Sequence, residues 1–241
     1  MYCYYLYDRQ YFCAIVKLLI IKSIAMKKIV LIGASGFVGS AILSELLNRD
    51  IEVTAVVRNP EGIKMSNPGL KIIKANISDV NIVAEICKDA DTVISAYNPG
   101  WSNPTIYEET LKTYPAILEG SKKANVKRLL IVGGAGTLFV APGVRVVDSG
   151  VIPSEILGAV RSLGEFYLNT LINEKEIDWV FFSPAGSLES GERTGTYRLG
   201  KDDLIVNEKG ESRISVQDYA KAMVDELENP QHSQERFTIG Y

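Results

Sequence analysis

Apolar runs and amphipathic segments alternate along the chain at short, regular intervals. The run at 29–32, Ile-Val-Leu-Ile, has no polar position, which is typical of a central parallel strand covered by helices on both faces. Similar runs predict strands at 52–57, 70–75, 91–96, 127–132, 178–182 and 237–240, and a short strand with a helix cap at 214–218. Periodicity and capping residues predict helices at 37–48, 80–88, 103–124, 154–175 and 219–227. This order predicts an α/β fold, a doubly wound parallel sheet.

The sequence contains no internal repeat, low-complexity tract or long linker that would divide it, so we expect a single domain at 26–241. Residues 137–153 are expected to be irregular. Residues 187–207 are rich in glycine, arginine and polar side chains. We expect them to form a small C-terminal lid over a substrate, reaching to about 213.

The first 25 residues differ from the rest of the chain. They are rich in tyrosine and isoleucine, and two lysines interrupt their apolar part. This makes the segment too short and too charged for a membrane-spanning helix, which needs about 20 apolar residues. It also lacks the basic start of a signal peptide. We interpret 1–25 as an extra segment outside the fold and expect translation to begin at Met26.

Three glycines follow the first strand at intervals of three residues. In that spacing the first glycine permits a tight turn, the second lets a pyrophosphate approach the backbone, and the third lets the next helix pack closely on the strand. The N-terminal amides and positive dipole end of the helix at 37–48 then face the phosphates. The pattern predicts a dinucleotide-binding turn formed by Gly33, Ser35, Gly36, Phe37, Val38 and Gly39.

Two other interpretations of this turn are possible. A phosphate loop of the nucleotide triphosphatase type would need a glycine at position 38 followed by lysine, but the chain has Val38 and then Gly39-Ser40. The glycines could also serve only a tight turn and a packing contact. A strand before them and a helix after them favour the dinucleotide interpretation.

The second predicted strand ends in Arg58, at the position that discriminates between nicotinamide nucleotides. NAD sites usually place Asp or Glu there to hold the ribose 2′-hydroxyl, whereas arginine accommodates the 2′-phosphate of NADP. Arg58 therefore predicts NADP(H), with NAD(H) possible. It also argues against a methyltransferase site, which needs an acid at this strand end. The alternative is a solvated arginine at the start of a loop.

Ligands of doubly wound sheets lie beyond the carboxyl ends of the strands. This rule extends the expected cofactor site to Asn76, Ile77, Ser95, Ala96, Tyr97 and Pro184. On the substrate side we expect Asn98, Trp101 and Gly134. The rings of Tyr97 and Trp101 could stack on a flat acceptor, or they could simply cover the sheet edge or a helix.

Composition excludes several classes of function. The 241 residues have a formal net charge of −3 and scattered lysines and arginines, so no basic face for nucleic acid is expected. Three cysteines without paired spacing indicate neither a disulfide framework nor a zinc site. The single histidine, His232, argues against histidine triads and metal clusters. We expect a cytoplasmic monomer or homodimer that acts on a small molecule, without metal or membrane.

Four motifs together resemble the short-chain dehydrogenase/reductase superfamily: the glycine turn at 33–39, Arg58-Asn-Pro, the run at 178–184 ending in Ser-Pro, and Ile-Ser-Val-Gln-Asp-Tyr-Ala at 214–220. More narrowly, the chain is similar to the atypical NAD(P)-binding branch, often labelled NAD-dependent epimerase/dehydratase or NAD(P)H-binding. That branch includes flavin and biliverdin reductases and redox-sensing nitrogen metabolite repressors. The resemblance covers 26–241 and implies a Rossmann fold that binds a nicotinamide cofactor.

The catalytic signature of that superfamily is a tyrosine four residues before a lysine, often with a glutamate four residues after the lysine. Counting back from Glu165, the resemblance places Arg161 at the lysine position and Leu157 at the tyrosine position. Arg161 is expected to bind ribose hydroxyls but not to act as a base. The usual acid is therefore missing.

The other parts of the signature are also absent or displaced. The superfamily has a serine at the end of the fifth strand, but the chain has Gly-Gly-Ala-Gly at 133–136 and no hydroxyl before Thr137. Tyr197 and Lys201 have the Tyr-x-x-x-Lys spacing, yet they follow the sixth strand. We interpret that match as a coincidence of spacing.

Two classes of function remain. The first is an NADPH-dependent reductase of a small acceptor, of the flavin or quinone type, in which solvent supplies the proton. The second is a redox sensor that binds a nicotinamide nucleotide without turnover. A nucleotide-sugar epimerase or dehydratase is a third alternative, which the missing tyrosine and the short C-terminal segment disfavour.

Overall fold

The computed structural model describes residues 28–241, so the predicted extra segment at 1–25 and the start at Met26 lie outside the described residues. Strands of the main sheet are β1 (Ile29–Ile32), β2 (Val53–Val57), β3 (Leu70–Lys74), β4 (Thr92–Ser95), β5 (Arg128–Val132), β8 (Asp178–Ser183), β10 (Arg198–Gly200) and β12 (Glu235–Gly240). The α-helices are α2 (Phe37–Asn48), α3 (Val80–Ile86), α4 (Ile106–Lys123), α5 (Ser154–Asn169) and α6 (Val216–Glu228).

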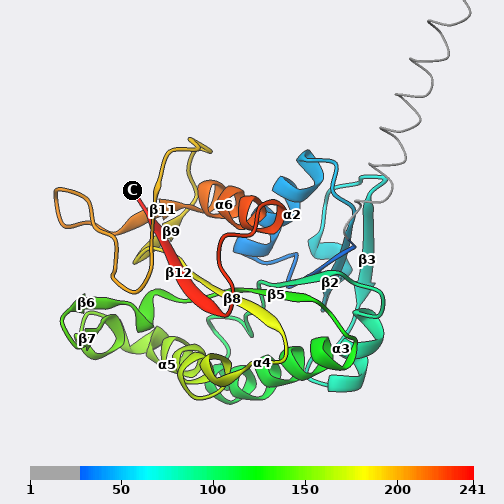
Figure 1. The fold of residues 1–241 in the computed structure, drawn as a ribbon, viewed down its shortest axis with the longest axis horizontal. Coiled ribbons are helices and arrows are strands. Elements are labelled where there is room, and N and C mark those ends of the chain that lie inside the picture. Colours follow the sequence, from blue (N-terminus) through cyan, green and yellow to red (C-terminus); the bar gives the residue numbers. More distant parts are fainter. Residues whose placement is uncertain (1–27) are drawn as a thin grey trace, which may run out of the picture.

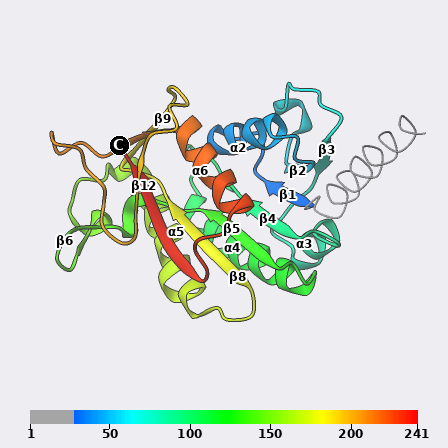
Figure 2. The ribbon, with the colours of Figure 1, turned by 45° about the horizontal axis from the view of Figure 1, so that its top comes forward.

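The eight strands form one sheet in the order β10-β12-β8-β5-β4-β1-β2-β3. All neighbours are parallel except β10 and β12, which are antiparallel. Helices α2 and α6 cover one face, and α3, α4 and α5 cover the other (Figure 1; Figure 2). The predicted doubly wound α/β fold is confirmed.

Strand β1 is fully buried because both of its faces are covered. Ile29 and Leu31 pack in the core beneath α2 and α6, whereas Val30 and Ile32 pack in the core beneath α3, α4 and α5. A strand covered on both sides has no solvent-facing position, which explains its uninterrupted apolar sequence. The strand order reverses at β1, between β4 and β2, so its carboxyl end lies at the point where such sheets bind ligands.

Helix α2 has the predicted bounds, but three other helices are shorter than expected, and α3 ends at Ile86 instead of 88. Helix α4 begins at Ile106, because Asn103 Oδ1 accepts hydrogen bonds from the amide and hydroxyl of Thr105 (3.0 and 2.9 Å) and so forms a turn before the helix. Helix α5 ends at Asn169 instead of 175. The fully buried Leu171 starts a separate 3-10 turn there.

The segment at 137–153, expected to be irregular, contains a hairpin of β6 (Phe139–Ala141) and β7 (Val144–Arg145), so that expectation is wrong for 139–145. Pro142 and Gly143 supply the turn, and Gly143 has a φ of +75°. Within residues 28–241, no helix combines the length and apolar character needed to cross a bilayer.

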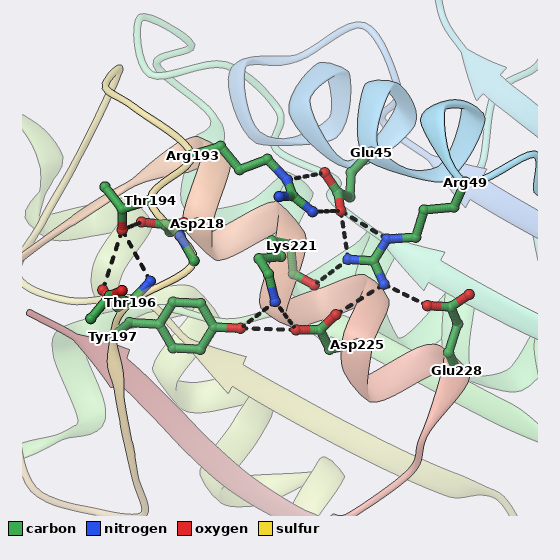
Figure 3. Close-up of polar contacts among 11 residues, drawn as sticks. Glu45, Arg49, Arg193, Thr194, Thr196, Tyr197, Asp218, Lys221, Asp225 and Glu228 are labelled. Atoms are coloured by element: carbon green, nitrogen blue, oxygen red, sulfur yellow. Dashed lines mark hydrogen bonds and ion pairs between the residues drawn. The ribbon is translucent and has the colours of Figure 1, made fainter.

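The predicted lid at 187–213 is attached to the body of the protein. Its strand β9 (Ser187–Glu189) pairs with β11 (Arg213–Ser215), and β10 extends the main sheet. Between these strands, Arg193 binds Glu45 of α2, and Tyr197 donates to Asp225 of α6 (Figure 3). The role of this segment as a lid stays a prediction.

Candidate functional site

Two of the three glycines in the turn after β1 have no room for a side chain. Gly33 has a φ of +79°, and a Cβ there would lie 2.5 Å from the carbonyl oxygen of Ala96. A Cβ on Gly39 would lie 2.1 Å from the carbonyl oxygen of Gly33, so α2 packs directly on the turn. At Gly36 the nearest atom to a Cβ, the Gly33 oxygen, is 3.4 Å away. The fold thus requires Gly33 and Gly39, whereas Gly36 can accept a small side chain.

The start of α2 is suited to a phosphate. Its N-cap residue is Gly36, no side chain caps the helix, and its first turn contains no acidic residue. The first amides of a helix lack partners within it and carry its positive dipole end. Phe37 and Val38, in that first turn, line the larger of two spaces at the carboxyl edge of the sheet. The residues present therefore fit the pyrophosphate of a dinucleotide.

The smaller space, about 210 Å³, lies on the β2 side of the turn. Predicted residues that line it but not the larger space are Gly33, Ser35, Arg58 and Ile77. The Arg58 side chain is exposed, and its Nη2 donates to the carbonyl oxygen of Pro99 at 3.2 Å. In the described part of the chain no carboxylate lines this space. The position where NAD sites use an acid is occupied by Arg58 and Asn59.

The larger cavity, about 400 Å³, extends from the start of α2 to helices α4 and α5. Its wall includes Trp101 of the β4–α4 loop, Gly134 of the glycine run after β5, and Pro184 after β8. A volume of this size is typical of small-molecule sites. Among residues 28–241, no Asp, Glu, Lys, Arg or His lines the cavity. Apolar side chains and glycine backbone form most of its surface.

Ala96, Tyr97 and Asn98 line both spaces and form the wall between them, and Gly36 borders both at the start of α2. The structure therefore places most of the predicted residues around one continuous site. Four others line neither space: Gly39, Asn76, Ser95 and Arg161. Ser95 is fully buried, and Arg161 is exposed on α5.

Sequence reasoning missed the wall that α5 provides. Ile156, Val160 and Leu163 line the cavity from one face of α5, with Ile152 just before the helix, and Leu188 of β9 also lines it. Leu188 is also the one residue of the predicted lid segment that lines it. The spacing of 156, 160 and 163 is helical, but such a stripe normally indicates core packing. The signal that could have identified this stripe as part of the site is its position near the carboxyl ends of the strands.

Two tyrosines line the cavity, and neither is activated. Tyr114 donates its hydroxyl proton to the carbonyl oxygen of Tyr97 at 2.8 Å. Burial raises the pKa of Tyr114 above its ordinary value of 10, and burial also raises the pKa of Tyr97. Both therefore remain protonated near neutral pH and are poor proton donors.

The positions that carry catalysis in the resembled superfamily do not assemble an acid–base pair. Leu157 and Arg161 line neither space. Thr137 does line the larger cavity, but its Oγ1 accepts a hydrogen bond from Arg236 at 2.9 Å. Glu165 accepts a hydrogen bond from Tyr107 on α4.

Tyr197 and Lys201, which have the sequence spacing of a catalytic pair, have different partners. The Tyr197 hydroxyl donates to Asp225 at 2.9 Å and lies 3.4 Å from the Lys221 ammonium (Figure 3). Lys201 pairs with Glu235 at 3.1 Å. Neither residue lines the cavity. The geometry supports a coincidence of spacing.

A doubly wound sheet with a glycine turn after its first strand, at the reversal of strand order, defines a dinucleotide-binding protein of the Rossmann type. The model of the NAD(P)H-binding family matches residues 33–230. The chain belongs to this NAD(P)H-binding family, and its cofactor is a nicotinamide nucleotide.

Similar proteins cover nearly the whole chain. The Bacillus subtilis protein YwnB, which is uncharacterised, is 41% identical over 88% of this chain and 97% of its own. A Bacteroides thetaiotaomicron crystal structure, of a protein proposed to be an epimerase, is 64% identical with a TM-score of 0.85 and covers 90% of this chain and 97% of its own. A Streptococcus pneumoniae structure, of a protein proposed to be an NADH-flavin reductase, is 32% identical with a TM-score of 0.77. The match covers 89% of this chain and 99% of that protein's chain.

Proposed function

We propose that this protein is an NADPH-dependent reductase of a small planar acceptor, of the flavin or quinone type. One observation carries the proposal: the nucleotide-binding turn opens directly into an apolar cavity whose described lining residues contain no acid–base pair. A hydride transfer that needs positioning of the acceptor but no side-chain acid suits such a site. The similarity to a proposed NADH-flavin reductase supports the same activity.

Bound NADPH supplies a hydride, and the protein's own residues position the acceptor. Trp101 and Tyr97, which follow β4, offer aromatic surface, and the aliphatic face of α5 forms another part of the wall. Because no activated side-chain acid lines the cavity in the described residues, the acceptor takes its proton from solvent.

The preference for NADP(H) over NAD(H) is part of the proposal. Arg58 borders the smaller space, where the ribose 2′-phosphate would bind, and no carboxylate of the described chain opposes it there. A guanidinium binds phosphate with charge-assisted hydrogen bonds. The hydrogen bond from Arg58 to the carbonyl oxygen of Pro99 holds the guanidinium near this space.

Two other functions have specific support. A redox sensor that binds NADP(H) without turnover would also combine an intact nucleotide turn with an incomplete catalytic site. An epimerase would agree with the proposal made for the Bacteroides protein. However, it would need a group that moves a proton at a sugar carbon, and neither tyrosine of the cavity is activated for that step.

The deciding experiment measures NADPH oxidation at 340 nm with purified protein, alone and with lumiflavin, riboflavin or a naphthoquinone. The proposal predicts oxidation that depends on the acceptor. Tight NADPH binding without oxidation by any acceptor would favour the sensor. Interconversion of a nucleotide sugar would favour the epimerase.

Cellular location and oligomeric state are further parts of the proposal. A small-molecule reductase of this kind would act in the cytoplasm as a monomer or homodimer.

Cys87 is a buried free thiol whose pKa burial raises to about 12, so it is suited to packing and not to redox chemistry.

A further inference from the structure

We infer that the acceptor is uncharged, and that the cavity discriminates against an acceptor with an anionic group on or next to its ring. This inference rests on the proposed reductase function and adds a substrate class to it. It depends on the absence of charged side chains among the described residues that line the cavity.

The wall offers no cation to an anionic acceptor. No Lys, Arg or His of the described chain lines the cavity. Arg236 approaches it from behind Thr137, but it is 6% exposed, and Thr137 and Asp202 occupy its guanidinium. Arg58 belongs to the smaller space, beyond the wall formed by 96–98. A carboxylate or phosphate between α4 and α5, away from the α2 amides assigned to the pyrophosphate, would therefore lose hydration without gaining an ion pair.

The same wall can orient a neutral carbonyl compound. Asn98 lines the cavity, and its Oδ1 accepts a hydrogen bond from the Gly100 amide at 2.7 Å, which fixes the side-chain amide. The Nδ2 protons of Asn98 are then available to an acceptor carbonyl oxygen. Trp101, 60% exposed, presents its ring at the same wall. One donor and flat aromatic surface are what a quinone or an isoalloxazine ring needs.

A matched pair of ring compounds tests the inference by binding alone. Lumiflavin is neutral and carries a methyl group at N10, whereas carboxymethylflavin has a carboxylate one carbon from the same nitrogen. Each is titrated into the full chain with 1,4,5,6-tetrahydro-NADP present, whose nicotinamide ring is uncharged and cannot transfer a hydride, and quenching of tryptophan fluorescence is followed. We expect lumiflavin to bind at least about tenfold more tightly. Burying a carboxylate without a charged partner lowers the binding free energy by more than about 1.4 kcal/mol, which corresponds to that factor.

Adding a cation should reverse this preference. Ile152 is half-buried and lines the cavity, whereas its neighbour Val151 is 69% exposed and does not. Ile152→Lys is expected to tighten carboxymethylflavin binding about tenfold and to weaken lumiflavin binding. Val151→Lys adds the same charge one residue away and is expected to leave both affinities within about twofold.

The outcomes separate this inference from the proposed function. Tighter binding of lumiflavin, with reversal in Ile152→Lys only, supports the inference. Equal or tighter binding of carboxymethylflavin by the unmodified protein overturns it and leaves the reductase proposal standing. If neither flavin binds and no quinone is reduced, the reductase proposal fails, and the inference fails with it.

Discussion

The cavity at the carboxyl edge of the sheet and the contact region between α2 and α6 differ sharply in charge. On the α4/α5 side, the cavity is lined without a single charged side chain of the described residues. On the α2/α6 side, Glu45, Arg49, Arg193, Lys221 and Asp225 form a continuous set of ion pairs (Figure 3). Glu45 is only 6% exposed, yet hydrogen bonds from Arg193 and Arg49 keep its pKa below the ordinary value.

Helix α2 takes part in both regions. Its first turn borders the cavity, and two turns later Glu45 binds Arg193 of the segment between β9 and β10. The charged region fixes the position of segments that are far apart in sequence, where directional contacts are useful. The uncharged region leaves space for a ligand. Substitutions along this one helix should therefore separate ligand binding from stability.

The largest effect is expected at the start of α2. Gly36→Val should weaken NADPH binding about 100-fold, because the branched side chain fills the path of the pyrophosphate. Gly36→Ala is the matched control, since a Cβ there meets its nearest atom at 3.4 Å. Both variants should have similar melting temperatures. Fluorescence titration with NADPH gives the result, and normal binding by Gly36→Val would show that the pyrophosphate lies elsewhere.

Next in size is the effect of removing the buried charge further along the helix. Glu45→Gln should destabilise the protein by about 2 kcal/mol, because it leaves Arg49 and Arg193 without their shared carboxylate. The NADPH affinity should not change. Urea unfolding measures the loss, and Glu235→Gln, which breaks the exposed pair with Lys201, should cost less than about 0.5 kcal/mol. An equal loss of unfolding free energy in Glu45→Gln and Glu235→Gln would show that the ion pairs of Glu45 with Arg49 and Arg193 stabilise the fold no more than an exposed pair does.

A smaller effect is expected from Arg58→Asp, which should shift the affinity ratio of NADPH to NADH by about tenfold toward NADH. The reason is the loss of the cation at the predicted 2′-phosphate position. Arg58→Lys retains the charge and should keep most of the preference. Affinities are compared by titration with both nucleotides. An unchanged ratio in Arg58→Asp would remove the basis for NADP(H) preference.

The smallest effect concerns acid stability. The pKa of Glu45 is lower in the folded protein than its ordinary value of 4.5, so its stabilisation is fully present above about pH 5 and is lost as the pH falls through the folded-state pKa. The difference in unfolding free energy between the unmodified protein and Glu45→Gln should therefore shrink below pH 4.5. Urea unfolding from pH 7 down to pH 3.5 tests this, and a constant difference would contradict the pKa assignment.

Local sequence was enough to predict the nucleotide turn. Glycine spacing, the buried strand before it and the amphipathic helix after it are all short-range signals, and α2 has the predicted bounds of 37–48. Arg58 was likewise found from its place at the end of a strand, and it borders the smaller space. These features depend on backbone geometry that neighbouring residues determine.

The other parts of the site depend on contacts between distant segments. Val160 and Leu163 resemble ordinary core residues until the docking of α5 places them at the strand ends. Glu45 resembles a solvated helix position, but Arg193, 148 residues later, covers it. Arg161 was placed in the site by counting along the superfamily pattern, yet its side chain is exposed and lines neither space.

The most direct test of the central claim is a single-turnover experiment without oxygen. Protein, NADPH and lumiflavin are mixed in equal amounts, and absorbance is followed at 340 nm for the nicotinamide and near 450 nm for the flavin. The account predicts that NADPH is oxidised and lumiflavin is bleached together, one for one, and much faster than in the absence of protein. Bound NADPH that persists while the flavin keeps its colour would contradict it.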